Sequence, residues 1–141
     1  MKENEIIEHY FKKGQSGLRG MVIGLVGSLG AGKTQFVKKL LSQISVDFEN
    51  LVHSPTFNLC NVYSDEEFEV HHFDVYRVES EDELYDIEIW ESTENTNVLT
   101  LIEWADRFSD IKLKCDEIIE ISICEDEKRE YLIKVNNVRL G

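Results

Sequence analysis

Hydrophobic residues recur along this chain with two kinds of spacing, and these separate its predicted helices from its predicted strands. Helical spacing predicts a short helix near the N-terminus and a longer one after residue 33. The apolar stripes of these two helices are Ile6, Ile7, Tyr10 and Phe11, and then Phe36, Val37, Leu40, Leu41 and Ile44. Residues 21–26 and 98–102 are instead short, continuous apolar runs, which indicate strands buried on both faces.

Two pairs of segments are predicted to form β-hairpins. Residues 57–63 and 68–76 flank the turn-like sequence SDEE, and residues 117–123 and 131–135 flank the polar sequence CEDEKRE. Between the two hairpins, the sequence SEDELYDIEIW predicts a helix that is capped by Ser80, with Glu83 at the capping-box position.

These elements predict one α/β domain over residues 1–141, with a mixed, mainly parallel central sheet and β-hairpins. The composition is that of a globular protein, with 42% hydrophobic and 30% charged residues. The sequence contains no run of about 18 apolar residues, so it predicts no membrane-spanning helix. The N-terminal sequence lacks the apolar core of a signal peptide, and the three cysteines, with no CxxC pair, indicate reduced thiols. We therefore expect a cytoplasmic protein.

Acidic residues outnumber basic ones by 28 to 15, which gives a net charge of −13. Sequence-independent binding of DNA or RNA depends on lysine and arginine side chains that face phosphates. The charge therefore argues against such binding, although an acidic surface alone names no partner.

The sequence GSLGAGKT, residues 27–34, satisfies the pattern GxxxxGK[ST]. It follows a predicted buried strand and leads into a predicted helix, which is the setting that a phosphate-binding loop requires. Glycines let backbone N–H groups turn toward phosphates, a lysine reaches the β- and γ-phosphates, and the final hydroxyl ligates Mg²⁺. The alternative is a glycine-rich turn, but the strand–loop–helix context favours phosphate binding.

An acidic residue on a neighbouring strand commonly completes the metal site of such loops. In LTLIEWADR, Glu103 follows an apolar strand and is a candidate, although an acid also follows many strands by chance. In VHHFDVYR, strand alternation places Val70, His72, Asp74 and Tyr76 on one face. A histidine and an aspartate there suit proton transfer, but the pattern alone favours a polar pair on a solvated face.

Five segments in this order, GSLGAGKT, SPTF, HFDVYR, ELYDIEIWE and LIEW, closely resemble the TsaE (YjeE) family. Those proteins are bacterial P-loop ATPases required to make threonylcarbamoyladenosine on tRNA. The resemblance covers about residues 20–110. It implies a single P-loop NTPase domain that binds ATP and Mg²⁺ and supports turnover by TsaD- and TsaB-like proteins. Together with the acidic charge, it implies that the chain meets tRNA only indirectly, through those partners.

The resemblance also implies roles for individual residues. Thr34 and Glu103 are the implied ligands of Mg²⁺, with Glu103 as the Walker B acid. Thr56 of SPTF belongs to an implied switch-like segment near the γ-phosphate, Asp74 is the implied water-positioning group, and Trp104 is implied to lie close to the nucleotide. The residues implied to bind the ATP phosphates are Gly27, Ser28, Leu29, Gly30, Ala31, Gly32, Lys33 and Thr34.

Two positions depart from the family pattern. Ser28 stands where the family usually has an acidic residue, which bears on how the catalytic water or a partner is contacted. Glu88 stands where a glycine is usual, and a non-glycine residue resists a positive φ.

Other classes of protein also use phosphate loops. A small-molecule or nucleotide kinase usually needs several arginines to hold two phosphorylated substrates. A GTPase needs an NKxD motif, which this sequence lacks. A nucleotide-gated binding module would bind ATP without useful turnover. Few arginines lie near the motifs, so we expect the isolated chain to be a weak ATPase that depends on its partners. The arginines are Arg19, Arg77, Arg107, Arg129 and Arg139.

Overall fold

A computed structural model describes residues 1–28, 30–45, 48, 52 and 59–135. The helices are α1 (Glu3–Phe11), α2 (Gly14–Leu18), α3 (Lys33–Ile44), α4 (Glu81–Asp86), α5 (Ile89–Glu94), the 3-10 helix η2 (Ala105–Arg107) and α6 (Ser109–Lys114). The strands are β1 (Val22–Val26), β2 (Cys60–Ser64), β3 (Glu69–Asp74), β4 (Val98–Glu103), β5 (Glu117–Ile123) and β6 (Arg129–Val135).

The six strands form one sheet in the order β2-β3-β4-β1-β5-β6. The central pairs β3–β4, β4–β1 and β1–β5 are parallel, whereas β2 and β6 are antiparallel edge strands that close the two predicted hairpins. The predicted α/β class with a mixed, mainly parallel sheet is confirmed. Because β1, β3 and β4 run in the same direction, the segments that follow them meet at the carboxyl ends of these strands.

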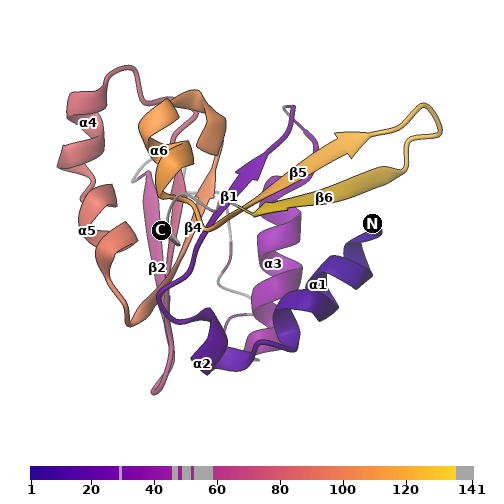
Figure 1. The fold of residues 1–141 in the computed structure, drawn as a ribbon, viewed down its shortest axis with the longest axis horizontal. Helices are drawn as coiled ribbons and strands as arrows, with labels where there is room; N and C mark the ends of the chain where they lie inside the picture. The colour runs from indigo at the N-terminus through magenta and orange to yellow at the C-terminus, as the bar shows by residue number, and fades with distance from the viewer. Residues whose placement is uncertain (29, 46–47, 49–51, 53–58, 136–141) are drawn as a thin grey trace.

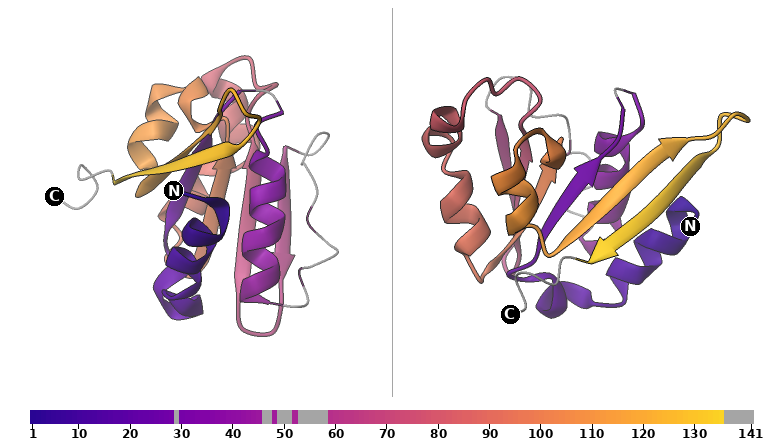
Figure 2. Two further views of the ribbon diagram at one scale, coloured as in Figure 1. Left: turned by 90° about the vertical axis from the view of Figure 1, so that its right-hand side faces the viewer. Right: turned by 45° about the horizontal axis from the view of Figure 1, so that its top comes forward.

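Helices cover both faces of the sheet (Figures 1 and 2). On one face, Ile6 and Tyr10 of α1 and Phe36 and Leu40 of α3 pack against the central strands. On the other face, α4, α5 and α6 contribute Leu84, Ile89 and Ile111 to a second core. Each of the central strands β1 and β4 supplies residues to both cores, which explains their unbroken apolar sequences.

The helix predicted within SEDELYDIEIW is present as α4, but the predicted capping by the Ser80 side chain is not. Glu88 has φ 59° and ψ 33°, a left-handed conformation that interrupts the helix and divides it into α4 and α5. Ser80 does occupy the N-cap position of α4, but its side chain makes no capping hydrogen bond. The carboxylate of Glu83 instead accepts a hydrogen bond from the backbone N–H of Glu79, at 3.4 Å.

Within the described ranges, every helix is too short or too polar to span a membrane.

Candidate functional site

The glycine-rich loop joins the carboxyl end of β1 to the start of α3, as the sequence predicts. A Cβ atom on Gly27 would lie 2.7 Å from the carbonyl oxygen of Ile121 on β5, so the neighbouring strand admits only glycine there. Gly32 caps α3 with φ 100°, a conformation that glycine adopts readily. This geometry points the N-terminus of a 12-residue helix, with its partial positive charge, at the space above the loop.

Lys33 folds back over the loop. Its Nζ atom donates hydrogen bonds to the carbonyl oxygens of Gly27 at 2.8 Å and Ser28 at 3.0 Å. The same atom lies 4.1 Å from the centre of the Trp104 ring, so the indole face also contacts the cation. Only 5% of the Lys33 surface is exposed, and the loop therefore holds its ammonium group in place.

The charge of Lys33 is influenced by burial and by nearby acids. Burial is the largest effect and lowers the pKa of Lys33 below that of an exposed lysine, whereas Glu103, Asp74 and Asp106 act in the opposite direction by stabilising its charged form. A cation that is already stripped of water and directed by the loop is suited to bind an anion.

Glu103 and Thr34 meet although 69 positions separate them. The Thr34 hydroxyl lies 2.9 Å from each carboxylate oxygen of Glu103, and Glu103 is 3% exposed at the carboxyl end of β4. Among the described residues, no cluster of three or more His, Cys, Asp or Glu side chains would hold a metal by itself. One hydroxyl and one carboxylate fit Mg²⁺, which keeps waters and phosphate oxygens among its ligands.

Asp74 ends β3 directly beside Glu103, because the parallel register of β3 and β4 pairs these two residues. Its Oδ1 atom accepts a hydrogen bond from the backbone N–H of Tyr76 at 3.0 Å. Tyr76 itself lies beyond the end of the strand, and its ring packs against Trp104 with the ring centres 4.6 Å apart. The sheet therefore places the two predicted acids side by side, next to the loop.

His72 contradicts the interpretation of a polar pair on a solvated face, since its exposure is 0%. Its Nε2 atom lies 2.6 Å from Oε2 of Glu103, and its Nδ1 atom lies 3.0 Å from the Tyr63 hydroxyl. The strand faces the core because α3 covers it, so a histidine can occupy this position only with hydrogen-bonding partners. Sequence analysis considered His72 with Asp74 for proton transfer but did not predict its contact with Glu103; the signal was a polar residue at an inward position between Val70 and the strand end.

A cleft of about 300 Å³ lies over the loop. It brings together predicted residues from three separate motifs, and it adds two residues that sequence analysis missed, Gln35 and Arg129. Thr56 and Leu29 lie outside the described residues, so their predicted roles have no structural counterpart here. The cleft is lined by Gly30, Gly32, Lys33, Thr34, Gln35, Asp74, Glu103, Trp104 and Arg129.

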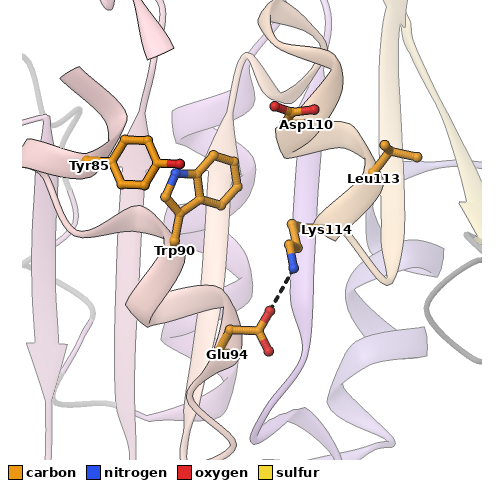
Figure 3. Close-up of a pocket in the computed structure, with 6 residues that line it drawn as sticks. All are labelled: Tyr85, Trp90, Glu94, Asp110, Leu113 and Lys114. Carbon is orange, nitrogen blue, oxygen red and sulfur yellow. Dashed lines mark hydrogen bonds and ion pairs between the residues drawn. The ribbon is translucent and has the colours of Figure 1, made fainter. Parts of the chain in front are cut away.

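A second hollow, of about 410 Å³, lies between α5 and α6 on the opposite side of the sheet from α3 (Figure 3). An ion pair of 2.9 Å between Lys114 and Glu94 crosses it, and Trp90 and Tyr85 form its aromatic side. None of the predicted site residues lines this hollow. The candidate site is therefore the cleft over the loop.

Comparison with known proteins gives consistent matches. The family model described as "Threonylcarbamoyl adenosine biosynthesis protein TsaE" matches residues 2–132. The TsaE protein of Aquifex aeolicus is 39% identical over 79% of this chain and 75% of its own length, and that of Treponema pallidum is 35% identical over 81% and 82%. The crystal structure of Bacillus subtilis YdiB is similar with a TM-score of 0.59 and 26% identity, over 99% of this chain and 84% of that one.

Proposed function

The chain belongs to the TsaE family of tRNA threonylcarbamoyladenosine biosynthesis, and we propose that it serves this modification as a Mg²⁺-dependent ATPase. The observation that carries the proposal is the contact of Thr34 with both oxygens of Glu103, next to Lys33. In this proposal, two motifs whose contacting residues are 69 positions apart supply, in one cleft, a phosphate-binding loop, a cation and a metal-binding pair.

The loop residues bind and orient the nucleotide in this proposal. Backbone N–H groups at the start of α3 and the Nζ atom of Lys33 bind phosphate oxygens, and Lys33 exchanges its loop carbonyl partners for them. Thr34 and Glu103 hold Mg²⁺, which when bound neutralises charge on the phosphate oxygens. Trp104 contributes an aromatic wall beside Lys33.

Asp74 is the group that we assign to the water. Asp74 lines the cleft beside Glu103, and Glu103 is the acid that contacts the Thr34 hydroxyl, so we assign the metal to Glu103 and the water to Asp74. A carboxylate at this position accepts a hydrogen bond from a water molecule and orients it for attack.

TsaD- and TsaB-like proteins are the partners that we propose, and tRNA is reached through them. A net charge of −13 disfavours direct approach to a polyanion. The same charge disfavours DNA as a partner. A protein surface that binds this chain would complete its activity, for example by adding positive charge at the cleft.

ATP turnover measured with the chain alone, with a TsaD–TsaB pair, and with that pair plus tRNA tests the proposal. We expect slow turnover alone and a clear increase with the partners. Full activity from the chain alone, with no increase on adding partners, would contradict the dependence on partners. Fluorescence anisotropy with tRNA at physiological salt tests the indirect contact, and submicromolar binding by the isolated chain would contradict it.

A further inference from the structure

Arg129, the first residue of β6, reaches the glycine-rich loop from the other end of the sequence. Its Nε atom donates a hydrogen bond of 2.7 Å to the carbonyl oxygen of Ala31, which lies 98 positions earlier. The side chain also packs on Gly32, because a Cβ atom added to that glycine would lie 2.9 Å from the Nε atom of Arg129. A cationic side chain of the C-terminal hairpin thus contacts the loop.

The bond to Ala31 uses one of the five N–H donors of the guanidinium group. In the part of the chain that the structure describes, Ala31 is the only hydrogen-bond acceptor that the Arg129 side chain contacts. Arg129 interacts electrostatically with Glu3, whose carboxylate accepts a hydrogen bond from Tyr131 at 2.7 Å and pairs with Lys39. Glu3 is therefore committed to other partners, and the outer N–H groups of Arg129 remain available.

Arg129 also borders the cleft. Arg129 is exposed and lines the same 300 Å³ space as Lys33, Thr34 and Glu103. A guanidinium group that only supported the loop would have no reason to line the space above it. The planar guanidinium group of arginine donates paired hydrogen bonds that match phosphate oxygens, and a second cation beside Lys33 would help to neutralise the negative charge of a polyphosphate.

We propose that Arg129 is a nucleotide-phosphate ligand, which holds the loop through Ala31 and presents its terminal N–H groups to the polyphosphate. The inference rests on the proposed function, since it requires a nucleotide in the cleft. It changes the expectation drawn from the scarcity of arginines near the motifs, because the fold brings one to the loop. It also makes the C-terminal hairpin part of the nucleotide site.

Calorimetric titration with Mg-ADP and with a non-hydrolysable ATP analogue, at low and high KCl, tests this role in three variants. We expect Arg129→Gln to weaken both affinities by about tenfold or more, the loss typical of a charged hydrogen-bonding partner. Arg129→Lys keeps the positive charge but loses the paired donors of the guanidinium group, and we expect an intermediate loss of affinity. Arg19→Gln is the matched control. Arg19 precedes the amino end of β1, whereas the loop follows its carboxyl end, and the Arg19 side chain donates a hydrogen bond to the Glu67 carbonyl oxygen.

The salt dependence separates a ligand from a support. If Arg129 contacts phosphate, removing its charge makes the affinity less sensitive to KCl than that of the wild type. An affinity of Arg129→Gln within twofold of the wild type would overturn the inference, and so would a loss with unchanged salt dependence. Failure of the wild type to bind either nucleotide would overturn the proposed function as well.

A measurement on the unaltered protein covers the case in which Arg129→Gln does not fold. In ¹⁵N-labelled wild-type protein, the guanidinium signals of Arg129 should shift and its terminal groups should rotate more slowly on addition of Mg-ADP. Signals that stay unchanged at saturating Mg-ADP would overturn the inference.

Discussion

The Nε2 atom of His72 lies 2.6 Å from the Oε2 atom of Glu103, and both side chains are buried. The Glu103 carboxylate is thereby held from two sides, by His72 from behind and by Thr34 from the loop. The Nδ1 atom of His72 lies 3.0 Å from the Tyr63 hydroxyl, so one chain of polar contacts runs from β2 to the loop. Such outer partners orient the groups that bind metals.

Replacing His72 with alanine should therefore destabilise the protein by about 2–4 kcal/mol, because it removes a buried partner that both the Glu103 carboxylate and the Tyr63 hydroxyl contact. His71→Ala is the matched control on the same strand. His71 contacts Ser92, whose hydroxyl keeps Thr100 as a partner at 2.7 Å, and we expect a loss of about 1 kcal/mol or less. Urea unfolding measures both values, and equal destabilisation would contradict the prediction.

Lys33→Ala should abolish tight binding of Mg-ATP, with a loss of affinity of about a hundredfold or more, because it removes the charge that the loop directs into the cleft. Lys38→Ala is the matched control, since Lys38 is an exposed residue of the same helix. Calorimetric titration gives the affinities, and circular dichroism checks that both variants are folded. Wild-type affinity in Lys33→Ala would show that the loop does not bind the nucleotide through this residue.

Glu103→Gln and Asp74→Asn should both retain nucleotide binding and lose most ATP hydrolysis, about a hundredfold in kcat, because each loses a charge needed at the metal or at the water. Asp106→Asn removes a carboxylate that also senses Lys33 but does not line the cleft, and it should keep its activity. ATP turnover of each variant, measured in the presence of the TsaD–TsaB pair, tests this prediction. Parental rates in both variants would refute the assigned roles.

Glu88→Gly should stabilise the protein by about 0.5–1 kcal/mol, because Glu88 is an exposed residue held at φ 59°, where a side chain is unfavourable. Glu91→Gly is the matched control. Glu91 is also exposed, but it lies within α5 in a right-handed conformation, so glycine there should destabilise by about 1 kcal/mol. Thermal and urea unfolding give both signs; a loss of stability in Glu88→Gly would contradict the prediction.

Cys60 should react slowly with iodoacetamide at neutral pH. Burial raises the pKa of its thiol to about 11, with a smaller opposing effect from the backbone of His72, so the reactive thiolate is scarce below that pH. Because the pKa is raised, the rate should increase with pH up to at least pH 10. Mass spectrometry of the alkylated peptide follows the rate, with Cys60→Ser identifying the site. A plateau below pH 9 would contradict the prediction.

Local sequence was enough to predict the glycine-rich loop and the strands around it, whereas phosphate binding by that loop stays a prediction. The pattern GxxxxGK[ST] lies within eight residues, and its glycines answer constraints that the loop itself imposes, such as φ 100° at Gly32. The strands β1 and β4 could be predicted from their continuous apolar residues, which are needed because helices cover both faces of the sheet. Glu103 was proposed as a metal-binding acid because it ends one of those strands, and that role stays a prediction. The roles of Asp74 and Trp104 in hydrolysis and nucleotide binding stay predictions, as does that of Thr56.

The environment of each side chain was decided by the tertiary structure. His72 and Glu103 meet because the register of β3 and β4 places them near each other, and strand alternation alone did not reveal which face α3 would cover. Arg129 reaches Ala31 only because β6 folds back along β5 at the sheet edge. A motif records which residues are neighbours in the chain, whereas hydrogen bonds and burial depend on distances between segments, and packing of the whole sheet with its helices sets those distances.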